Sequence, residues 1–370
     1  MPTSPPPADL STVTAALRDA PEFLAGWLGR TPDGEDLLRE RLSLSDTQLH
    51  RLLACRAPNP LHYGRDVQAL ARFVDVPDTT LAAALREASV LAALATRTES
   101  AATTTPRPAA GLLTAAHDNV AEQIPRSAPA VRVQELAAAT WAAAPESVRE
   151  ERDVDAAVVW ASPVVIVSMP HLQLASANRW LTDRGAPSLP DETGELRGLL
   201  VAWRGYAAIF LDGTMTSAER RFTLAHEHGH FLLDYQLARQ RILRDAPDLL
   251  EVIDGHRPAT NGDRAKASLA RVPIGLHTHL LHRDDHGGAG GATMASEDDA
   301  SLYALELLSP WDSLLRFLRS LALPGGAHAD RVAAASAAVA SEFGLPDDAA
   351  QARAAAGMET LGIKRGFFDR

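Results

Sequence analysis

A histidine-rich stretch near the middle of the chain, RFTLAHEHGHFLLDY at residues 221–235, has the residue types and spacing of a metal centre. His226 and His230 are four residues apart, so on a helix their side chains lie on one face about 6 Å apart and can bind the same ion. Glu227 is rotated by roughly 100° from His226 around the helix. A carboxylate there can take a proton from a water molecule that the metal has acidified and pass it to a leaving amine. The motif predicts a metal-dependent hydrolase.

A helix that is merely rich in histidine is the alternative explanation. The chain has 13 His among 370 residues, and a chance HExxH motif is expected in roughly a few per cent of such chains. The surrounding residues also favour a functional helix, because Thr216 and Glu219 have the spacing of a capping box. Ala225 and Gly229 form a column of small residues that allows close packing. We expect His228, which points away from the pair, to be exposed to solvent or to support the ligands from outside.

A catalytic zinc needs a third protein ligand and an open position. Asp234 lies in the same column, but two helical turns place it about 12 Å from His226 along the axis. It is therefore a poor ligand and a plausible hydrogen-bonding partner of one. Glu297, in the predicted helix SEDDASLYALELLSP, is the favoured third ligand because a helix positions a side chain more accurately than a loop does. A histidine cluster in GLHTHLLHRDDHGG remains a competitor and contains His277, His279, His282 and His286.

The composition is typical of a folded protein, with 46% hydrophobic and 22% charged residues, and the length predicts two or three domains. A net charge of -11 does not favour binding to nucleic acid or to acidic membranes. Cys55 is the only cysteine, which excludes an intrachain disulfide and a metal site made only of thiolates. The beginning of the chain lacks the basic start and apolar core of a secretory signal. We expect a cytoplasmic protein that does not bind membranes.

The apolar periodicity changes along the chain and predicts four parts. Residues 1–95 are predicted to be a helical N-terminal domain, and the Thr-, Ala- and Pro-rich residues 96–111 a linker. Residues 112–325 are predicted to form the domain that carries the chemistry, and residues 326–370 a helical C-terminal part of two short helices broken at 344–346.

Within the second domain, we expect helices near 112–124 and 133–144, followed by two strands at 156–160 and 164–168. The sequence GLLVAWRGYAAIFL predicts a hairpin with a tight turn at Arg204-Gly205. Residues 255–295 are expected to be irregular, and the helix with Glu297 begins near Ser296 and is stopped by Pro310. The fold class predicted from these elements is α+β.

Two stretches together resemble a known family, the ImmA/IrrE-type metallopeptidases. They are ERRFTLAHEHGHFLL at 219–233 and EDDASLYALELLSP at 297–310, the second of which is similar to that family's helix E-x-x-A-N-x-F-A-x-E-L-L-M-P. The preceding hairpin and the C-terminal EFGLPDDAAQARAAAGMETLGI extend the resemblance to about 198–365. It implies a zincin-like domain with a small sheet. It also implies the roles of four residues: His226, His230 and Glu297 bind the metal, and Glu227 is the general base.

The chain departs from the family pattern in three places. Glu297 follows His230 by 67 positions, which is longer than expected and predicts an insertion at about 240–290. Ser301 replaces an Asn of the family helix and Ser309 replaces a Met. Neither is a ligand position, so we expect the site to be kept.

The resemblance implies a bacterial peptidase of gluzincin type that binds Zn²⁺, with Mn²⁺ as the other candidate ion. Its implied substrate is a helix-turn-helix transcriptional repressor, whose cleavage switches on stress-response or mobile-element genes. The transition-state oxyanion needs a donor besides the metal. Candidates are His277, His279, His282 and Tyr303; the alternatives are a solvated loop for the histidines and an aromatic core position for Tyr303.

The N-terminal domain could be a helix-turn-helix module, which related peptidases often carry. However, residues 1–90 contain 9 Arg, no Lys and 12 acidic residues, whereas DNA-binding modules usually have a basic face. Arg51, Arg56 and Arg72 also fit an ordinary solvated surface. We therefore favour a module for protein contact or substrate recognition over a DNA-binding one.

Two other functions remain open on the sequence. One is a non-proteolytic DNA- or protein-binding regulator with a structural metal, although such a site has no use for Glu227 beside its ligands. The other is a metal hydrolase of small molecules, for which the insertion at 240–290 could wall off a pocket.

Overall fold

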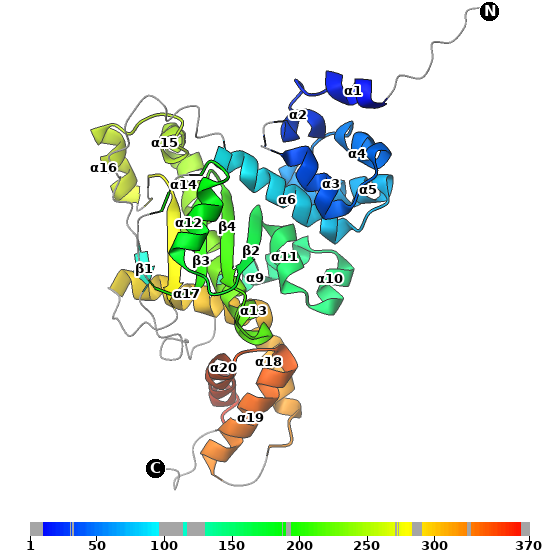
Figure 1. The fold of residues 1–370 in the computed structure, drawn as a ribbon. Coiled ribbons are helices and arrows are strands. Elements are labelled where there is room, and N and C mark those ends of the chain that lie inside the picture. The colour runs from blue at the N-terminus through cyan, green and yellow to red at the C-terminus, as the bar shows by residue number, and fades with distance from the viewer. Residues whose placement is uncertain are drawn as a thin grey trace, which may run out of the picture.

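The structure is a computed structural model that describes residues 10–29, 31, 33–95, 114–116, 130–186, 188–189, 194–270, 272, 274–282, 291–323 and 327–363. A helical N-terminal domain, a five-stranded sheet covered by helices and a helical C-terminal part follow one another along the chain (Figure 1). The predicted fold class, α+β with a zincin-like domain, is confirmed. The linker predicted at 96–111 lies outside the described residues.

The N-terminal domain is helical, as predicted. Helix α4 of this domain begins with a capping box formed by Ser45 and Gln48. The last helix, α6, leaves this domain and packs along the sheet, where Val90 joins the core of the central domain. The helices are α1 (Leu10–Ala16), α2 (Leu24–Leu28), α3 (Gly34–Leu42), α4 (Asp46–Leu53), α5 (Tyr63–Val74) and α6 (Asp78–Ala95), with a 3-10 turn, η1 (Pro60–His62).

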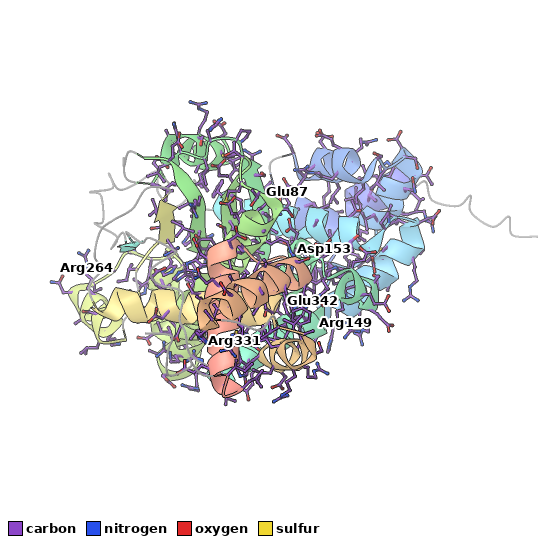
Figure 2. The ribbon with its side chains drawn as sticks, turned by 90° about the horizontal axis from the view of Figure 1, so that it is seen from below. Glu87, Arg149, Asp153, Arg264, Arg331 and Glu342 are labelled. Atoms are coloured by element: carbon purple, nitrogen blue, oxygen red, sulfur yellow. The ribbon has the colours of Figure 1, made fainter. Side chains whose placement is uncertain are left out.

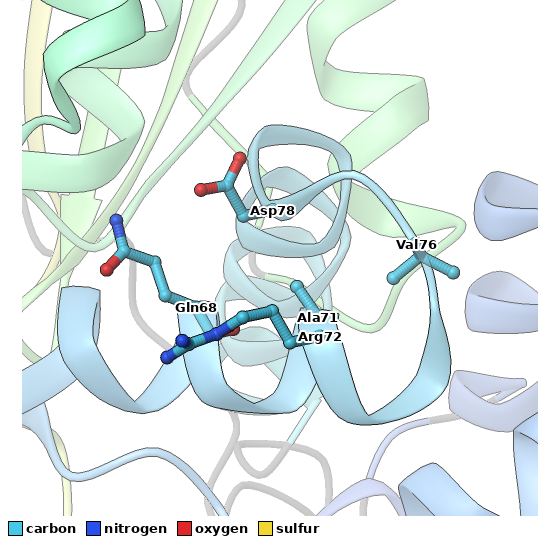
Figure 3. A pocket seen from close by; sticks show the side chains of 5 residues that line it. All are labelled: Gln68, Ala71, Arg72, Val76 and Asp78. Carbon is cyan, nitrogen blue, oxygen red and sulfur yellow. The ribbon is translucent and has the colours of Figure 1, made fainter.

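A hollow of about 380 Å³ lies where α5 meets α6 (Figure 3). Its charged lining residues are one cation, Arg72, and one carboxylate, Asp78. Because a phosphate backbone is bound by several cations together, this hollow gives no support to DNA binding. The other lining residues are Gln68, Ala71 and Val76.

The predicted hairpin forms the middle of the sheet. Strands β3 (Leu196–Trp203) and β4 (Tyr206–Asp212) are antiparallel, and Trp203 pairs with Tyr206 across the turn. Arg204 and Gly205 have φ values of 53° and 87°. Two successive left-handed residues are the requirement of a two-residue hairpin turn whose twist matches the strands. The tight turn predicted at these residues is confirmed.

Three further strands complete a mixed sheet in the order β1-β5-β3-β4-β2. Strand β2 (Val164–Met169) is parallel to β4, and β5 (His277–His282) is antiparallel to β3. The short edge strand β1 (Thr114–Ala116) is parallel to β5. The prediction that residues 255–295 are irregular was therefore wrong, because they contain β5 and a helix. The helix predicted near 112–124 was wrong at Thr114–Ala116, which form a strand. The rest of that segment, 112–113 and 117–124, lies outside the described residues.

The strand expected at 156–160 was also wrong. This apolar sequence forms helix α11 (Val154–Ala161), whose first turn is capped because the Asp153 carboxylate accepts a hydrogen bond from the backbone N–H of Ala156 at 3.0 Å. Val158 and Trp160 are buried on this helix. Cap and burial together override the strand preference of its valines.

The alternation of side chains along β3 and β4 defines two layers. One set, including Leu200 and Ile209, belongs to the core shared with the helices that carry the histidines and Glu297. The other set, including Leu199 and Phe210, belongs to a second core with helix α12 (Leu174–Thr182). Helices α9 (Val131–Ala143) and α10 (Glu146–Glu151) precede α11 in the chain.

The histidine helix, α13 (Ser217–His230), begins with the predicted capping box, in which Thr216 and Glu219 cap each other. It continues as a π-helical turn, η2 (Phe231–Gln236), and then as α14 (Leu237–Asp245). Helix α17 (Gly291–Leu308) begins earlier than predicted and ends before Pro310, as expected. The two helices approach closely at Gly229, where an added Cβ would lie 3.1 Å from both Ala300 Cα and Tyr303 Cδ1.

The predicted insertion at 240–290 contains two helices besides β5. Helices α15 (Pro247–Ile253) and α16 (Asn261–Ala270) share a small core with α14, built around Ile242 and Leu249. An ion pair between Arg239 and Asp254 joins α14 to the end of α15, and Arg204 Nε of the hairpin turn donates to the Asp254 carbonyl at 2.8 Å. The insertion is therefore folded on its own core.

The C-terminal part consists of α18 (Trp311–Ser320), α19 (His328–Phe343) and α20 (Asp347–Thr360). Gly344, with φ of 62°, ends α19, so the predicted break is confirmed. A polar hollow of about 460 Å³ lies between this part and helices α11 and α13. Asp153 and Glu342, which are labelled in Figure 2, are among its lining residues. In the described part of the chain, no helix has the length and apolar character needed to span a membrane.

Replacing Gly229 by Val is expected to destabilise the protein. The side chain would press into Ala300 and Tyr303 of α17, and overpacking of this kind costs about 1–3 kcal/mol. The thermal unfolding midpoint of the metal-free protein should fall. Gly262→Ala on α16 is the control, because its added Cβ would meet no atom closer than 3.7 Å. Equal midpoints for the two variants would show that the close approach is not needed.

Candidate metal centre

Four buried side chains from two helices and one strand of the sheet lie close together. His226 and His230 come from α13, Glu297 from α17 and His279 from β5. Their nitrogen and oxygen ligand atoms all lie within 4.8 Å of one another. None of the four residues is more than 4% exposed. The structure therefore brings the two helical histidines and the distant glutamate together, and adds His279.

Three of these atoms have the spacing of ligands around one ion. The Nε2 atoms of His226 and His230 are 3.1 Å apart. Glu297 Oε2 lies 3.3 Å from the first and 3.4 Å from the second. Tetrahedral zinc, with bonds of about 2.0–2.1 Å, holds its ligand atoms roughly 3.3–3.4 Å apart. The donor set of two imidazoles and one carboxylate fits a divalent cation such as zinc in both chemistry and spacing.

The outward nitrogen of each histidine is held by a neighbour. His230 Nδ1 lies 2.6 Å from Asp234 Oδ2, and His226 Nδ1 lies 3.3 Å from Ser301 Oγ. A proton fixed on Nδ1 leaves the lone pair of Nε2 facing the shared point. Ser301, which replaces the Asn of the family helix, thus serves the first histidine, and Ser296 Oγ donates to Asp234 at 2.7 Å.

Asp234 lies in the π-helical turn that follows the motif. It is a hydrogen-bonding partner of His230, as its position predicted, and is not a member of the donor group. Burial works against its ionisation, but the hydrogen bonds from His230 and Ser296 outweigh burial and lower the pKa of its carboxyl. The aspartate is therefore an anion that fixes the orientation of the His230 ring.

The carboxyl group of Glu297 is held as an anion by its neighbours. Burial alone would raise its pKa, but the neighbouring side chains of His226, His230 and His279 hold the pKa of this carboxyl far below its usual range. An ionised carboxylate surrounded by imidazoles is the arrangement that accepts a divalent cation without first losing a proton.

Glu227 is fully buried beside the donors. Its Oε2 lies 2.9 Å from His279 Nδ1, while its Oε1 has no hydrogen-bond partner among the described residues. Gly198 of β3 lies against this oxygen, and an added Cβ there would come within 2.8 Å of it. Strand β3 therefore packs directly against the carboxylate of Glu227, and only a residue without a side chain fits at position 198.

The remaining histidines do not join the donors. His277 is next to Tyr235, with ring centroids 5.7 Å apart, and burial lowers its pKa to about 4. His228, expected to be exposed unless it supports the ligands, is instead wholly buried. Its Nε2 is 2.8 Å from Ser162 Oγ, and burial lowers its pKa to about 3. The side chain of His282 and the whole of His286 lie outside the described residues.

Tyr303 has its hydroxyl away from the donor group. It is 2.9 Å from His228 Nδ1 and 2.8 Å from Thr140 Oγ1, and the ring is fully buried. Burial raises the pKa of this hydroxyl. Tyr303 therefore braces α13 against α9 and α17, and we do not assign it to the transition state.

The part of the chain that carries the HExxH motif is similar to a known family. The model of the peptidase M78 family, described as the IrrE N-terminal-like domain, matches residues 188–250. This segment contains the β3–β4 hairpin and α13, and hence His226, Glu227 and His230. No curated protein and no solved structure matches the chain. The resemblance inferred from the sequence is confirmed over this segment, which supports a metallopeptidase.

Removal of the Glu297 carboxylate should abolish stable metal binding. Of the three atoms at ligand spacing, Glu297→Ala would leave only the two nitrogens of α13, whereas a zinc site uses at least three protein ligands. Metal content after dialysis should fall from stoichiometric to near zero. His277→Asn is the control, since this nearby histidine lies outside the donor group. Full metal content in the Glu297 variant would refute the assignment.

Weakening the support of His230 should lower metal affinity less severely. Asp234→Asn replaces the anionic acceptor of His230 Nδ1 with a neutral amide, and such changes cost about 10–100-fold in metal affinity. Competition with a fluorescent zinc chelator measures the change. Asp298→Asn, an exposed neighbour of Glu297 on α17, should leave the affinity unaltered. Equal affinities for the two variants would contradict the role given to Asp234.

Proposed function

We propose that this protein is a zinc-dependent endopeptidase that makes limited cuts in a protein regulator. The observation that carries the proposal is the convergence of His226, His230 and Glu297 at ligand spacing, with the buried carboxylate of Glu227 beside them. The site geometry supports a metal-dependent hydrolase, and the similarity of residues 188–250 to a peptidase family supports peptide bonds as the bonds that it hydrolyses.

The chain's own residues would perform three tasks in peptide hydrolysis. When a divalent cation is held by His226, His230 and Glu297, it supplies a Lewis acid that polarises the scissile carbonyl and acidifies water. Glu227 takes the proton from the attacking water as the new C–O bond forms. It then gives this proton to the amine as the C–N bond breaks. Glu227 is adjacent in the chain to the ligand His226 and is held by the contact of its Oε2 with His279 Nδ1 at 2.9 Å, which supports this role.

Zinc is the proposed ion, with manganese as the alternative. Imidazole nitrogens and one carboxylate suit zinc, whereas manganese prefers a larger number of oxygen ligands. In the described part of the chain, the atoms at ligand spacing are two imidazole nitrogens and one carboxylate oxygen. This donor set favours zinc.

The proposed substrate is a helix-turn-helix repressor, supported by the resemblance to ImmA/IrrE-type peptidases. The N-terminal helical domain would hold the protein substrate. In this domain the guanidinium of Arg51 lies over the half-exposed ring of Phe73, 4.4 Å from its centroid. An aromatic side chain at the surface suits contact with a protein, whereas the acidic balance of this domain does not suit contact with DNA.

A structural metal in a non-proteolytic regulator is the second candidate. One observation favours it: four buried protein donors are the number that a closed structural zinc site uses. Against it stands Glu227, which such a site would bury beside the ligands without a task. The two candidates differ in whether His279 binds the ion.

Glu227→Gln should abolish proteolysis while metal binding is kept. The amide matches the shape of the carboxylate but cannot accept the proton, and removal of a general base costs about 100–10,000-fold in rate. The assay is the appearance of a fragment when the chain is co-expressed with helix-turn-helix proteins encoded beside it, and hydrolysis of fluorescein-labelled casein by the purified protein. Persistent cutting by the metal-loaded variant would refute the proposed role, and absence of cutting by the unaltered protein would favour a structural metal.

A further inference from the structure

His279 is hydrogen-bonded to two carboxylates at once. Its Nδ1 lies 2.9 Å from Glu227 Oε2, and its Nε2 lies 2.9 Å from Glu297 Oε1. The first partner is the proposed base and the second is the proposed ligand. A single ring on β5 therefore joins two residues that belong to different helices, α13 and α17.

The two hydrogen bonds decide what this ring can do. Both ring nitrogens of His279 are engaged by carboxylate oxygens, Nδ1 by Glu227 and Nε2 by Glu297, so neither is free to bind a metal ion in this arrangement. Glu297 also divides its oxygens, since Oε1 faces His279 while Oε2 faces His226 and His230. The contacts of His279 are thus those of a brace and not those of a fourth ligand.

The ring is also fixed in place by its surroundings. His279 is 3% exposed, and its backbone pairs with Leu200 of the central strand β3. Its ring stacks on that of His230, with centroids 3.6 Å apart and an angle of 24° between the planes. A strand in the sheet gives the side chain little freedom, so the position of both carboxylates is set by the fold.

We propose that His279 is a positioning residue that couples the base Glu227 to the metal ligand Glu297. Through Nε2 it orients the carboxylate that holds the ion, and through Nδ1 it fixes the base relative to that ion. The role of Nδ1, which fixes the base, rests on the proposed peptidase function. The role of Nε2, which orients Glu297, concerns metal binding alone.

Two replacements of His279 separate the role of Nδ1 from the role of Nε2. The amide nitrogen of Asn can take the place of Nδ1, so His279→Asn keeps a donor to Glu227 and loses the donor to Glu297. The longer His279→Gln places its amide nitrogen near Nε2 and keeps the donor to Glu297 instead. We expect the Asn variant to have the larger loss of zinc affinity, about 10–100-fold. The Gln variant should have the larger loss of kcat when loaded with zinc, about 100-fold, because the base is misplaced.

The measurements are zinc affinity by chelator competition, hydrolysis of fluorescein-labelled casein, and the visible absorption spectrum of the full-length protein loaded with Co²⁺. Because His279 is not a ligand in this proposal, the Co²⁺ bands of both variants should match those of the unaltered protein. His277→Asn, on the same strand and outside the donor group, is the control for general damage to β5. It should leave zinc affinity and the Co²⁺ bands unaltered.

Three results would overturn the inference. Equal loss of zinc in both variants with altered Co²⁺ bands would make His279 a fourth ligand. Unchanged zinc affinity in both would leave it a packing residue, and equal losses in the His277 control would assign the effects to the strand. If the unaltered protein binds zinc but cuts no protein, the peptidase proposal fails, while the difference in zinc affinity between the Asn and Gln variants still tests the link to Glu297.

Discussion

The buried carboxylate of Glu297 is the group on which the arrangement of the site depends. An ionised carboxylate inside a protein costs several kcal/mol unless hydrogen bonds and opposite charge compensate for it. Here the compensation comes from three imidazoles, two on α13 and one on β5. Helix α17 must therefore lie close to α13 and to the sheet, and the absence of a side chain at Gly229 makes that approach possible.

Strand β3 connects the parts of the site that the chain separates. It pairs with β5, which carries His279, and its Gly198 lies against the free oxygen of Glu227. The same strand forms the hairpin with β4 that supplies the inner core of the domain. His279 thus belongs to the sheet layer, whereas the base Glu227 and the metal ligands of α13 and α17 belong to the helices packed against it.

The third histidine of the motif has a different task. The ring of His228 lies between Ser162 and Tyr303, and the Tyr303 hydroxyl continues the chain of polar contacts to Thr140. These groups tie α13 to α17, α9 and the loop that follows α11. A buried polar network of this kind stabilises one arrangement of helices only when all of its members are satisfied. The histidine-rich motif therefore combines ligands on one face with a structural contact on the other.

The sequence by itself determined the local features: the HExxH helix with its capping box, the hairpin at Arg204-Gly205, and Glu297 on a helix ended by Pro310. Each depends on residues close together in the chain, where helix periodicity, caps and turn preferences act directly. Only the tertiary structure decided that residues 156–160 are a helix and that His279 is on a strand beside Glu227. The alternation of residue types in LHTHLLH (276–282) is typical of a strand. Its partner β3 lies before a long insertion in the chain, so no local pattern identified the pairing. Long-range packing decides which side chains surround a buried carboxylate. The reason is that strand pairing and helix packing bring together residues that are far apart in the chain and that no local pattern relates.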